Sequence, residues 1–392
     1  MASVRAPHWS LDPGITFLNH GSFGACPTRV IEAQRRWQGE LEKNPVDFLM
    51  RRLVPLLDEA RGRVAAFVGA PAESLAFVRN ATEGANAALK SVKLAPGDEV
   101  VTTNHDYNAI RNVLNYICER AGAKLVVAEF PFPLARKEQV IDAVVGAFTS
   151  RTKLLAIDHV TSPTGLVLPV VPILAEARVR NIVTFVDGAH APGMIPLDLR
   201  SLGADFYTGN LHKWVCAPKG AAFLHIKGDT RDHTLPPVIS HGYNMARPDR
   251  KYLDNFEWQG TFDPSAWLSV PNAIDTMASL HPDGWPGIMR ENRALALHAR
   301  DVLAYALGIE APAPDDMIGS LAALPLPPGK VAAHAPPCED PAQAALAERF
   351  RIEVPIPPWP KPPGRLLRIS AQLYNAPGDY ERLAAALGVI CL

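Results

Sequence analysis

Short apolar runs alternate with helix-like segments through the middle of the chain. Runs rich in Val, Ile and Leu end at polar residues, a pattern typical of strands buried on both faces, at 99–103, 124–129, 153–157 and 182–186. Other segments, such as 30–41 and 141–148, place apolar residues at steps of three and four, as one face of a helix requires. Strands that alternate with helices predict an α/β fold with a mostly parallel sheet covered by helices.

Prolines become dense late in the chain, between residues 312 and 363. Proline fixes φ and lacks an amide donor, so regular helix is interrupted there. Helical spacing is found at 292–307 and 380–387, and strand patterns at 331–333 and 350–356. These patterns favour a second, smaller α+β domain, with a disordered linker as the alternative.

The predicted domain organisation has three parts. Residues 1–25 form an N-terminal segment that packs near the functional site. Residues 26–264 form a large domain built on the parallel sheet. Residues 265–392 form the small C-terminal domain.

Composition and charge exclude several classes of protein. The chain of 392 residues is 48% apolar and 20% charged, as in an ordinary soluble globular protein. Its net charge of −1 argues against nucleic acid or a membrane surface as the main partner. The five cysteines are scattered without a CxxC pair, so we expect a cytoplasmic location and neither a metal site nor a disulfide framework. The first residues contain no apolar run, and no stretch reaches about 18 consecutive apolar residues, so we expect neither a signal peptide nor a spanning helix.

Polar clusters follow the predicted strands at the point where each strand ends. Asp187 opens one cluster, a second spans 158–165 and a third spans 104–108. Ligands of open α/β sheets bind beyond the carboxyl ends of the strands, so these clusters are expected to converge on one site. A fourth cluster, at 208–214, contains Lys213.

A turn at 79–86 follows the apolar run 75–78 and leads into a helical pattern. A turn of small residues that contains Thr82 and opens a helix suits a phosphate, because free amides and the positive end of the helix dipole face the anion. Thr82 followed by Glu83 is also what an ordinary helix cap looks like, so the turn alone leaves both interpretations open.

The combination of these features favours one kind of chemistry. A pyridoxal phosphate site needs a lysine that forms an imine, a carboxylate that keeps the pyridine nitrogen protonated, and a seat for the phosphate. We therefore predict that Lys213 holds pyridoxal 5'-phosphate as a Schiff base and that Asp187 pairs with the ring nitrogen.

At these positions the sequence resembles the class V aminotransferase superfamily of fold type I pyridoxal-phosphate enzymes, and within it the isopenicillin N epimerase-like group. The motifs that carry the resemblance run in family order over nearly the whole chain, at 17–24, 80–86, 159–165, 187–190, 209–214, 256–261 and 368–375. The resemblance implies a fold type I architecture, a large domain with a mostly parallel sheet and a smaller α+β domain. It also implies an amino-acid-type substrate and a homodimer.

The resemblance assigns roles to individual residues. Lys213 would move the proton at the substrate carbon, Asp187 would pair with the pyridine nitrogen, and Tyr107 would stack on the ring. His105 is a weaker candidate for that stack, because matching it to the family needs a gap. The other cofactor contacts that the family pattern implies are Ala81, Thr82, Ser162, His190, Asn210 and His212.

Contacts beyond the cofactor ring follow from the same resemblance. Gly260 and Thr261 match a loop that reaches the phosphate of the neighbouring subunit, which would make the site shared in a homodimer. Arg368 matches the arginine that grips a substrate carboxylate, a task that suits a planar guanidinium fork. Asn19 and His20 are assigned to substrate binding as well.

Structural roles stay open for these side chains. Lys213 is alternatively a surface cation, Asp187 a helix cap, Arg368 an edge salt bridge and Tyr107 a core residue. The histidines at positions 105, 190 and 212 are alternatively satisfied structural side chains.

One departure from a related group bears on the reaction. Cysteine desulfurases of the superfamily carry a nucleophilic cysteine on a loop before the carboxylate-binding arginine, and residues 350–368 contain none. The resemblance ranks epimerisation at Cα first and C–S lyase-type elimination from a cysteine-derived substrate second, with transamination as a further alternative. A non-catalytic homologue that binds the cofactor or a protein partner is the hypothesis from another class.

Overall fold

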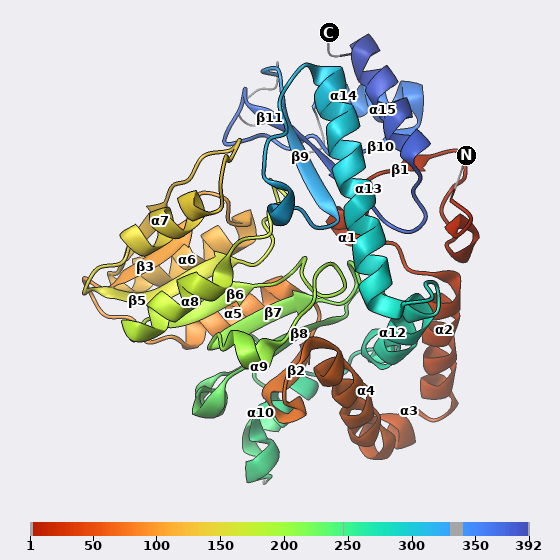
Figure 1. The fold of residues 1–392 in the computed structure, drawn as a ribbon. Helices are drawn as coiled ribbons and strands as arrows, with labels where there is room; N and C mark the ends of the chain where they lie inside the picture. Colours follow the sequence, from red (N-terminus) through yellow and green to blue (C-terminus); the bar gives the residue numbers. More distant parts are fainter. Residues whose placement is uncertain (1–2, 246, 330–339, 391–392) are drawn as a thin grey trace.

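The structure is a computed structural model that describes residues 3–245, 247–329 and 340–390. Within these residues the main sheet has seven strands in the order β2-β8-β7-β6-β5-β3-β4. Strand β8 pairs antiparallel with β2 and β7, and the remaining neighbours are parallel, so the prediction of a mostly parallel sheet is confirmed (Figure 1). The strands are β2 (Leu75–Val78), β3 (Glu99–Thr103), β4 (Lys124–Ala128), β5 (Thr152–Asp158), β6 (Val183–Asp187), β7 (Phe206–Asn210) and β8 (Ala222–Ile226).

Both faces of this sheet are buried, which explains why its strands are continuous apolar runs. Alternate residues of β5 point to opposite faces, so Leu155 lies in one core cluster and Leu154 in the other. One cluster is completed by α5 (Ala81–Ser91), α6 (Asn108–Ala121) and α10 (Lys251–Glu257). The other contains residues of α4 (Leu53–Val68), α7 (Glu138–Gly146) and α8 (Val170–Val179).

Helices from the start of the predicted large domain pack against helices from the start of the predicted small domain. The helices α11 (Ser265–Leu268) and α12 (Val270–Ala278) pack against α2 (Thr28–Lys43) and α4. Residues 265–278, which the prediction assigns to the small domain, therefore contact the predicted large domain. The other short helices here are α1 (His20–Phe23), α3 (Pro45–Asp47) and α9 (Leu199–Leu202).

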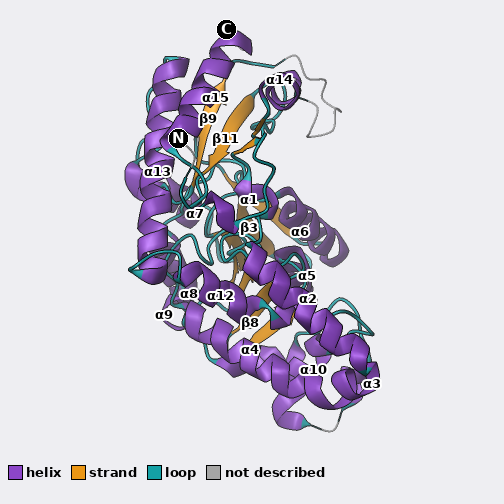
Figure 2. Cartoon of the chain, turned by 90° about the vertical axis from the view of Figure 1, so that its right-hand side faces the viewer, coloured by secondary structure: helices purple, strands orange, loops and turns teal. Residues whose placement is uncertain are grey.

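A smaller α+β unit lies at one end of the molecule (Figure 2). Its strands β9 (Leu321–Leu326) and β11 (Arg365–Ser370) form an antiparallel pair, against which α13 (Gly284–Leu307) packs. Strand β1 (Thr16–Phe17) pairs in parallel with β10 (Ile352–Glu353), so the N-terminal segment joins this unit. Its other helices are α14 (Pro341–Phe350) and α15 (Pro377–Ile390).

The proline-rich stretch contains regular structure. Strand β9 and helix α14 both lie in it, which contradicts the linker alternative for those residues. The strand pattern at 350–356 is realised only at Ile352–Glu353, because α14 continues to Phe350 and Arg351 ends it with φ 56°. The predicted strand at 331–333 lies outside the described residues.

A buried ion-pair network joins α4 to α10. Glu257 is 3% exposed and accepts hydrogen bonds from Arg61 and Arg250, and Asp58 pairs with the same two arginines. Burial raises the pKa of the Glu257 carboxyl, and the neighbouring Arg61 opposes that rise. Because removal of one partner leaves the other charge buried, the network is expected to be sensitive to single substitutions.

Glu257→Ala is expected to lower the free energy of unfolding by about 3 kcal/mol, the low end for a broken buried pair, because Asp58 still pairs with Arg61. The matched control is Glu176→Ala, which removes an exposed pair with Arg180 and is expected to cost at most about 1 kcal/mol. Urea unfolding of the two variants and the parent measures both values. Equal costs would show that the buried network does not stabilise the fold.

Candidate active site

A cavity of about 420 Å³ lies at the carboxyl ends of the parallel strands, where open α/β sheets bind ligands. Three other hollows, of about 480, 650 and 720 Å³, are larger. No described lysine lines the two largest, and the hollow of about 480 Å³ has Lys90 and Lys93 but no described carboxylate in its wall. The predicted site residues that line the cavity of about 420 Å³ are Ala81, Thr82, Tyr107, Ser162, Asp187, His190, Asn210, His212 and Lys213. The structure therefore brings most of the predicted cofactor contacts together.

Lys213 lies in the turn that follows β7, and its partly buried side chain lines the cavity. Burial lowers the pKa of its amine from 10.5 to about 8, and the Asp187 carboxylate opposes this shift. Its Nζ lies 3.1 Å from Nε2 of His190. A buried lysine with a lowered pKa has more uncharged amine near neutral pH, and that is the form that reacts with a carbonyl carbon. The alternative of a surface cation is wrong for this residue.

Asp187 ends strand β6 and is 4% exposed. One carboxylate oxygen accepts a hydrogen bond of 2.9 Å from the amide of Ala189, as in a turn cap. Asp158 ends the neighbouring strand β5 in register with Asp187, and it also lines the cavity. Burial raises the pKa of both carboxyls, and the Asp187 charge raises that of Asp158 further. A positively charged group in the cavity beside the two carboxyls would reduce the repulsion between their negative charges.

The predicted phosphate end is formed by the start of α5 and the turn after β7. Asn80 caps α5 by accepting from the amide of Glu83 at 2.9 Å. The Ala81 amide donates to Oδ1 of Asn210 at 2.9 Å, so this amide is not free to bind an anion here. Thr82 lines the cavity directly.

His212 also lines this end of the cavity. Its Nδ1 lies 3.1 Å from the carbonyl oxygen of Ala221 and therefore carries the proton. Burial lowers the pKa of His212 to about 4, which leaves Nε2 of the neutral ring as an acceptor. A phosphate beside this ring would raise the pKa and convert Nε2 into a donor.

Arg368 of β11 reaches the wall of the cavity without lining it. Its guanidinium donates to the carbonyl oxygen of Ser162 at 2.7 Å and to Oγ of Ser22 at 2.8 Å, and both serines line the cavity. Burial lowers the pKa of Arg368 to about 10, and its Nε has no partner among the described residues. Arg368 is thus held by neutral serines and lacks a carboxylate partner in the described part of the chain, which contradicts the edge salt bridge alternative.

Tyr107 and His105 have different environments. Tyr107 is 46% exposed and lines the cavity, so it is not a core residue. His105 is fully buried and stacks on Phe130 with ring centroids 3.9 Å apart. Its ring nitrogens bond to the hydroxyl of Thr164 and the carbonyl oxygen of Phe130. The structural alternative therefore describes His105.

Besides Arg368 and His105, four predicted residues lie outside this cavity wall. Asn19 bonds to Glu353 and Ser22, and His20 is 0% exposed, so neither lines the cavity. Gly260 and Thr261 are absent from the wall formed by their own chain. Gly260 has φ +123° and open space around its Cα. Residues that the sequence analysis left without a role, and that do line the cavity, include Ser22, Phe23, Arg79 and Asp158.

The N-terminal segment packs directly behind Lys213. His20 bonds through Nε2 to the Lys213 carbonyl oxygen at 3.0 Å and through Nδ1 to the Tyr374 hydroxyl at 2.8 Å. Gly24 has φ +70°, and a Cβ there would collide with the carbonyl oxygen of His212. The glycine in the 17–24 motif is therefore required by close approach of two backbones.

The residues present fit pyridoxal 5'-phosphate. The partly buried amine of Lys213 and the buried carboxylate of Asp187 face one cavity, and the start of α5 with His212 and Asn210 lies at the same cavity. No group of three or more His, Cys, Asp or Glu that suits a metal ion lies in the described ranges. Within those ranges there is also no helix with the length and apolar character needed to cross a membrane.

Comparisons with known proteins agree with this geometry. The family model for aminotransferase class-V matches residues 24–331. The isopenicillin N epimerase of Amycolatopsis lactamdurans is 39% identical over 398 aligned residues, which cover 96% of each protein. The putative L-cysteine desulfhydrase 1 of Oryza sativa subsp. japonica is 32% identical, over 98% of this chain and 85% of the relative.

Solved structures show the same architecture. The cysteine desulfurase CsdA from Escherichia coli has a TM-score of 0.78 at 22% identity, covering 98% of this chain and 96% of the other. The cystine C-S lyase C-DES has a TM-score of 0.78 at 20% identity, covering 96% and 97%. At identities this low, the two matches establish only that the fold is shared. They confirm the predicted fold class.

Proposed function

Because the chain belongs to the aminotransferase class-V family, we propose that it is a pyridoxal-phosphate enzyme that epimerises an amino-acid-type substrate at Cα. The observation that carries the proposal is the placement of Lys213 and Asp187 at one cavity, with the amine about half uncharged near pH 8. The relatives named isopenicillin N epimerase, 39% and 35% identical, support epimerisation as the first candidate reaction.

The proposed cofactor contacts come from the start of α5 and from the segments at the ends of β3, β5, β6 and β7. Lys213 and Asp187 would hold the two ends of the ring, and Tyr107 would cover one face. Thr82, Asn210 and His212 would contact the phosphate, and Ser162 and His190 the ring hydroxyl. Bound there, pyridoxal 5'-phosphate supplies an aldehyde carbon that reacts with amines and a ring that accepts the electron pair released at Cα.

The side chains of this protein would bind the substrate and move its proton. Arg368 would exchange its bonds to Ser22 and Ser162 for the substrate carboxylate, which orients Cα. Uncharged Nζ of Lys213 would remove the Cα proton. Epimerisation also needs an acid on the opposite face, and Tyr107 on the cavity wall is the candidate.

Incubation of the enzyme with L-amino acids and cysteine derivatives in heavy water tests the reaction. The proposal predicts deuterium at Cα with loss of configuration for at least one substrate. Release of pyruvate and ammonia without racemisation would replace epimerisation by elimination. Absence of both deuterium incorporation and product would favour a non-catalytic binding protein.

Elimination from a cysteine-derived substrate is the second candidate. A relative named as a putative L-cysteine desulfhydrase, 32% identical over nearly the whole chain, favours it. It needs no cysteine nucleophile, which agrees with the lack of cysteine between residues 350 and 368. Cys216 is 0% exposed, and burial raises the pKa of its thiol well above the usual range, so it is poorly suited to attack a substrate.

Cofactor capture by the apoenzyme is expected to accelerate as the pH rises through about 8, because only the uncharged Lys213 amine attacks the aldehyde. Stopped-flow absorbance after mixing apoenzyme with cofactor measures this rate. A free lysine derivative is the control, with its midpoint near its ordinary pKa of about 10.4. A rate that keeps rising by about tenfold per pH unit beyond about pH 9, as the free amine's does, would contradict the lowered pKa.

Arg368→Ala is expected to reduce kcat/KM by roughly 10²-fold, mostly through KM, because the substrate carboxylate loses a charge-assisted pair. Arg365→Ala is the matched control on the same strand, since Arg365 pairs with Asp340 and does not contact the cavity serines. Steady-state kinetics on the best substrate of the panel measures both. An unchanged KM in Arg368→Ala would show that Arg368 does not bind the substrate.

We further propose that two copies of the chain share each site. Gly260 and Thr261 do not line the cavity of their own chain, and Phe23 at the cavity is 74% exposed. A neighbouring subunit that brings Thr261 to the phosphate would cover this surface.

Co-expression of two inactive variants tests the shared site. Lys213→Ala removes the amine, and Thr261→Asp places a negative charge against the phosphate. In a mixed dimer, one site combines the intact Lys213 with the intact Thr261 of the other chain, so activity is expected to return. If Thr261 acts in its own chain, no mixture recovers activity.

The cytoplasmic location is kept as a proposal. Cys26, Cys118 and Cys216 are free thiols, which agrees with a reducing compartment. Fractionation of cells that express the tagged protein tests it.

A further inference from the structure

The side chains of Trp214, His190 and Lys213 form a hydrogen-bonded row at the cavity. The indole Nε1 of Trp214 lies 3.3 Å from Nδ1 of His190, and Nε2 of the same ring lies 3.1 Å from Nζ of Lys213. Trp214 is 1% exposed and His190 is 2% exposed, so water does not compete for the bond between these two rings. The family resemblance assigns no role to Trp214.

Elementary hydrogen-bond chemistry fixes the protons in this row. An indole N–H only donates, so Nδ1 of His190 must be the unprotonated acceptor. Burial lowers the pKa of His190 well below its ordinary value, and the charge of Lys213 lowers it further, so the ring is neutral. A neutral imidazole carries one proton, and with Nδ1 excluded it lies on Nε2. His190 therefore presents an N–H to Nζ of Lys213.

This donor discriminates between the two forms of the lysine. An ammonium group has only donors, so it faces the His190 N–H without forming a bond, whereas an uncharged amine accepts through its lone pair. We propose that Trp214 is a positioning residue: its indole N–H holds His190 in the Nε2–H tautomer, and this N–H stabilises the uncharged amine of Lys213. The inference rests on the proposed function only in the use that it gives to that amine.

Other groups also act on Lys213. Asp187 and Asp158 raise the pKa of its amine, while burial and the charge of Arg368 lower it. The two carboxylates would keep the lysine charged, and the His190 N–H acts in the opposite direction at the one atom that reacts.

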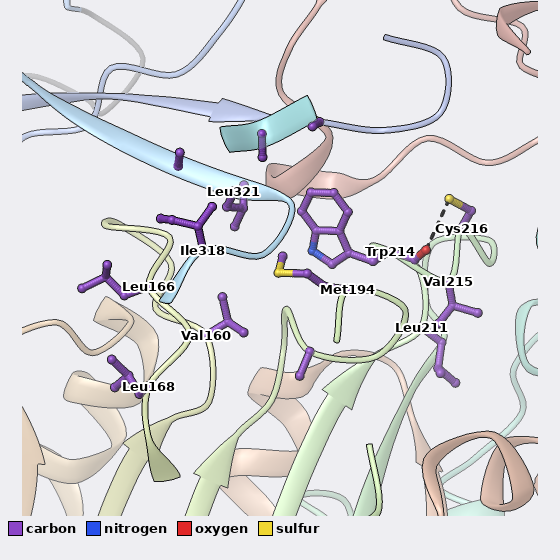
Figure 3. Packing of buried hydrophobic residues seen from close by; sticks show 14 of the residues in the cluster. Val160, Leu166, Leu168, Met194, Leu211, Trp214, Val215, Cys216, Ile318 and Leu321 are labelled. Carbon is purple, nitrogen blue, oxygen red and sulfur yellow. Dashed lines mark hydrogen bonds between the residues drawn. The ribbon is translucent and has the colours of Figure 1, made fainter. Parts of the chain in front are cut away.

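The indole is held rigidly enough for this task. Trp214 lies in a buried cluster with Met194 and Leu321 (Figure 3), and its ring is 4.9 Å from that of His20. Gly193 lies so close to the Trp214 carbonyl carbon that a Cβ would approach it to 2.7 Å. The loop after β6 is thus fixed against Trp214, and His190 belongs to that loop.

Nitrogen NMR of the ¹⁵N-histidine-labelled apoenzyme tests the tautomer without any activity. His190→Gln identifies the His190 signals by their loss. The proposal predicts an unprotonated Nδ1 and a protonated Nε2 in the parent protein. A protonated Nδ1, or an even mixture of tautomers, would overturn it.

Trp214→Phe tests the consequence for Lys213. The variant keeps an aromatic ring but loses the donor, so the pH midpoint of cofactor capture is expected to rise by about half to one unit, the value of one hydrogen bond. Trp267→Phe is the matched control, because the buried indole of Trp267 donates to the Gly220 carbonyl oxygen instead. An unchanged midpoint in Trp214→Phe would overturn the proposal.

A double-mutant comparison separates positioning from loss of packing. In the His190→Gln background, Trp214→Phe is expected to move the midpoint no further, since the imidazole through which it acts is gone. An equal shift in both backgrounds would assign the effect to packing and overturn the proposal. Failure of the parent apoenzyme to capture cofactor would count against the proposed function and leave the NMR result on the tautomer standing.

Discussion

Lys213→Ala is expected to abolish covalent capture of the cofactor and to slow hydrogen exchange at the substrate Cα by on the order of 10³-fold or more. The amine that reacts with the aldehyde and the base that removes the proton are the same atom, so one substitution removes both. The side chain lines the cavity and its pKa is lowered to about 8, and no other described lysine lines that cavity. Proton NMR in heavy water measures the exchange, and visible absorbance measures the bound cofactor.

Lys219→Ala is the matched control for this substitution. Lys219 lies six residues later, and its Nζ donates to the Gly24 carbonyl oxygen at 2.9 Å. It is expected to retain cofactor capture and exchange within about threefold, the level of a surface substitution. If Lys213→Ala still exchanged the Cα hydrogen at the parent rate, another group would be the base.

Asp187→Asn has the second largest expected effect, a loss of roughly 10² to 10⁴-fold in the same exchange rate. The carboxylate would stabilise a positive charge on the ring nitrogen, and that charge allows the ring to accept electrons from Cα. Asparagine keeps the size and the bond to the Ala189 amide through its carbonyl oxygen, but it carries no charge. Covalent capture at Lys213 is expected to survive in this variant.

In Asp187→Asn, hydrogen exchange at Cα is therefore expected to be slow while covalent capture of the cofactor is retained. Asp198→Asn is the control, because Asp198 caps the short helix α9 and does not line the cavity. Loss of cofactor capture together with exchange would indicate that Asp187 supports folding of the site. Retention of full exchange would show that the ring nitrogen does not depend on this carboxylate.

The central sheet could be predicted from the sequence because both of its faces are buried. A strand packed between two helix layers must be apolar throughout, and its end is marked by the first polar residue. Strand β3 agrees with the predicted 99–103, and β6 ends at Asp187, one residue beyond the predicted strand. Asp187 at the end of β6 and Tyr107 after β3 line the cavity, so the same pattern of polar residues after apolar runs predicts both the sheet and the site.

Contacts between distant segments could not be predicted in this way. The bonds of Arg368 to Ser22 and Ser162 join β11 to residues far away in the sequence, and no local pattern encodes them. The bonds of His20 to the Lys213 carbonyl oxygen and the Tyr374 hydroxyl also join residues that are far apart in the sequence. Asp158 had a signal, since it follows an apolar run as Asp187 does, but only the register of β5 with β6 places the two carboxyls side by side.

The domain boundary illustrates a second limit. Residues 265–278 have ordinary helical spacing, which does not tell against which helices they pack. The structure places α11 and α12 on α2 and α4, since the apolar faces of these helices bury one another. The domain limits after residues 25 and 264 therefore remain predictions.

Mapping of the covalently bound cofactor tests the account most directly. The holoenzyme would be reduced with borohydride, digested and examined by mass spectrometry for a peptide that carries the pyridoxyl group. The account predicts this mass on the peptide that contains Lys213, and its disappearance in Lys213→Ala. Attachment at another lysine, such as Lys219, or a cofactor that is released unattached, would contradict it.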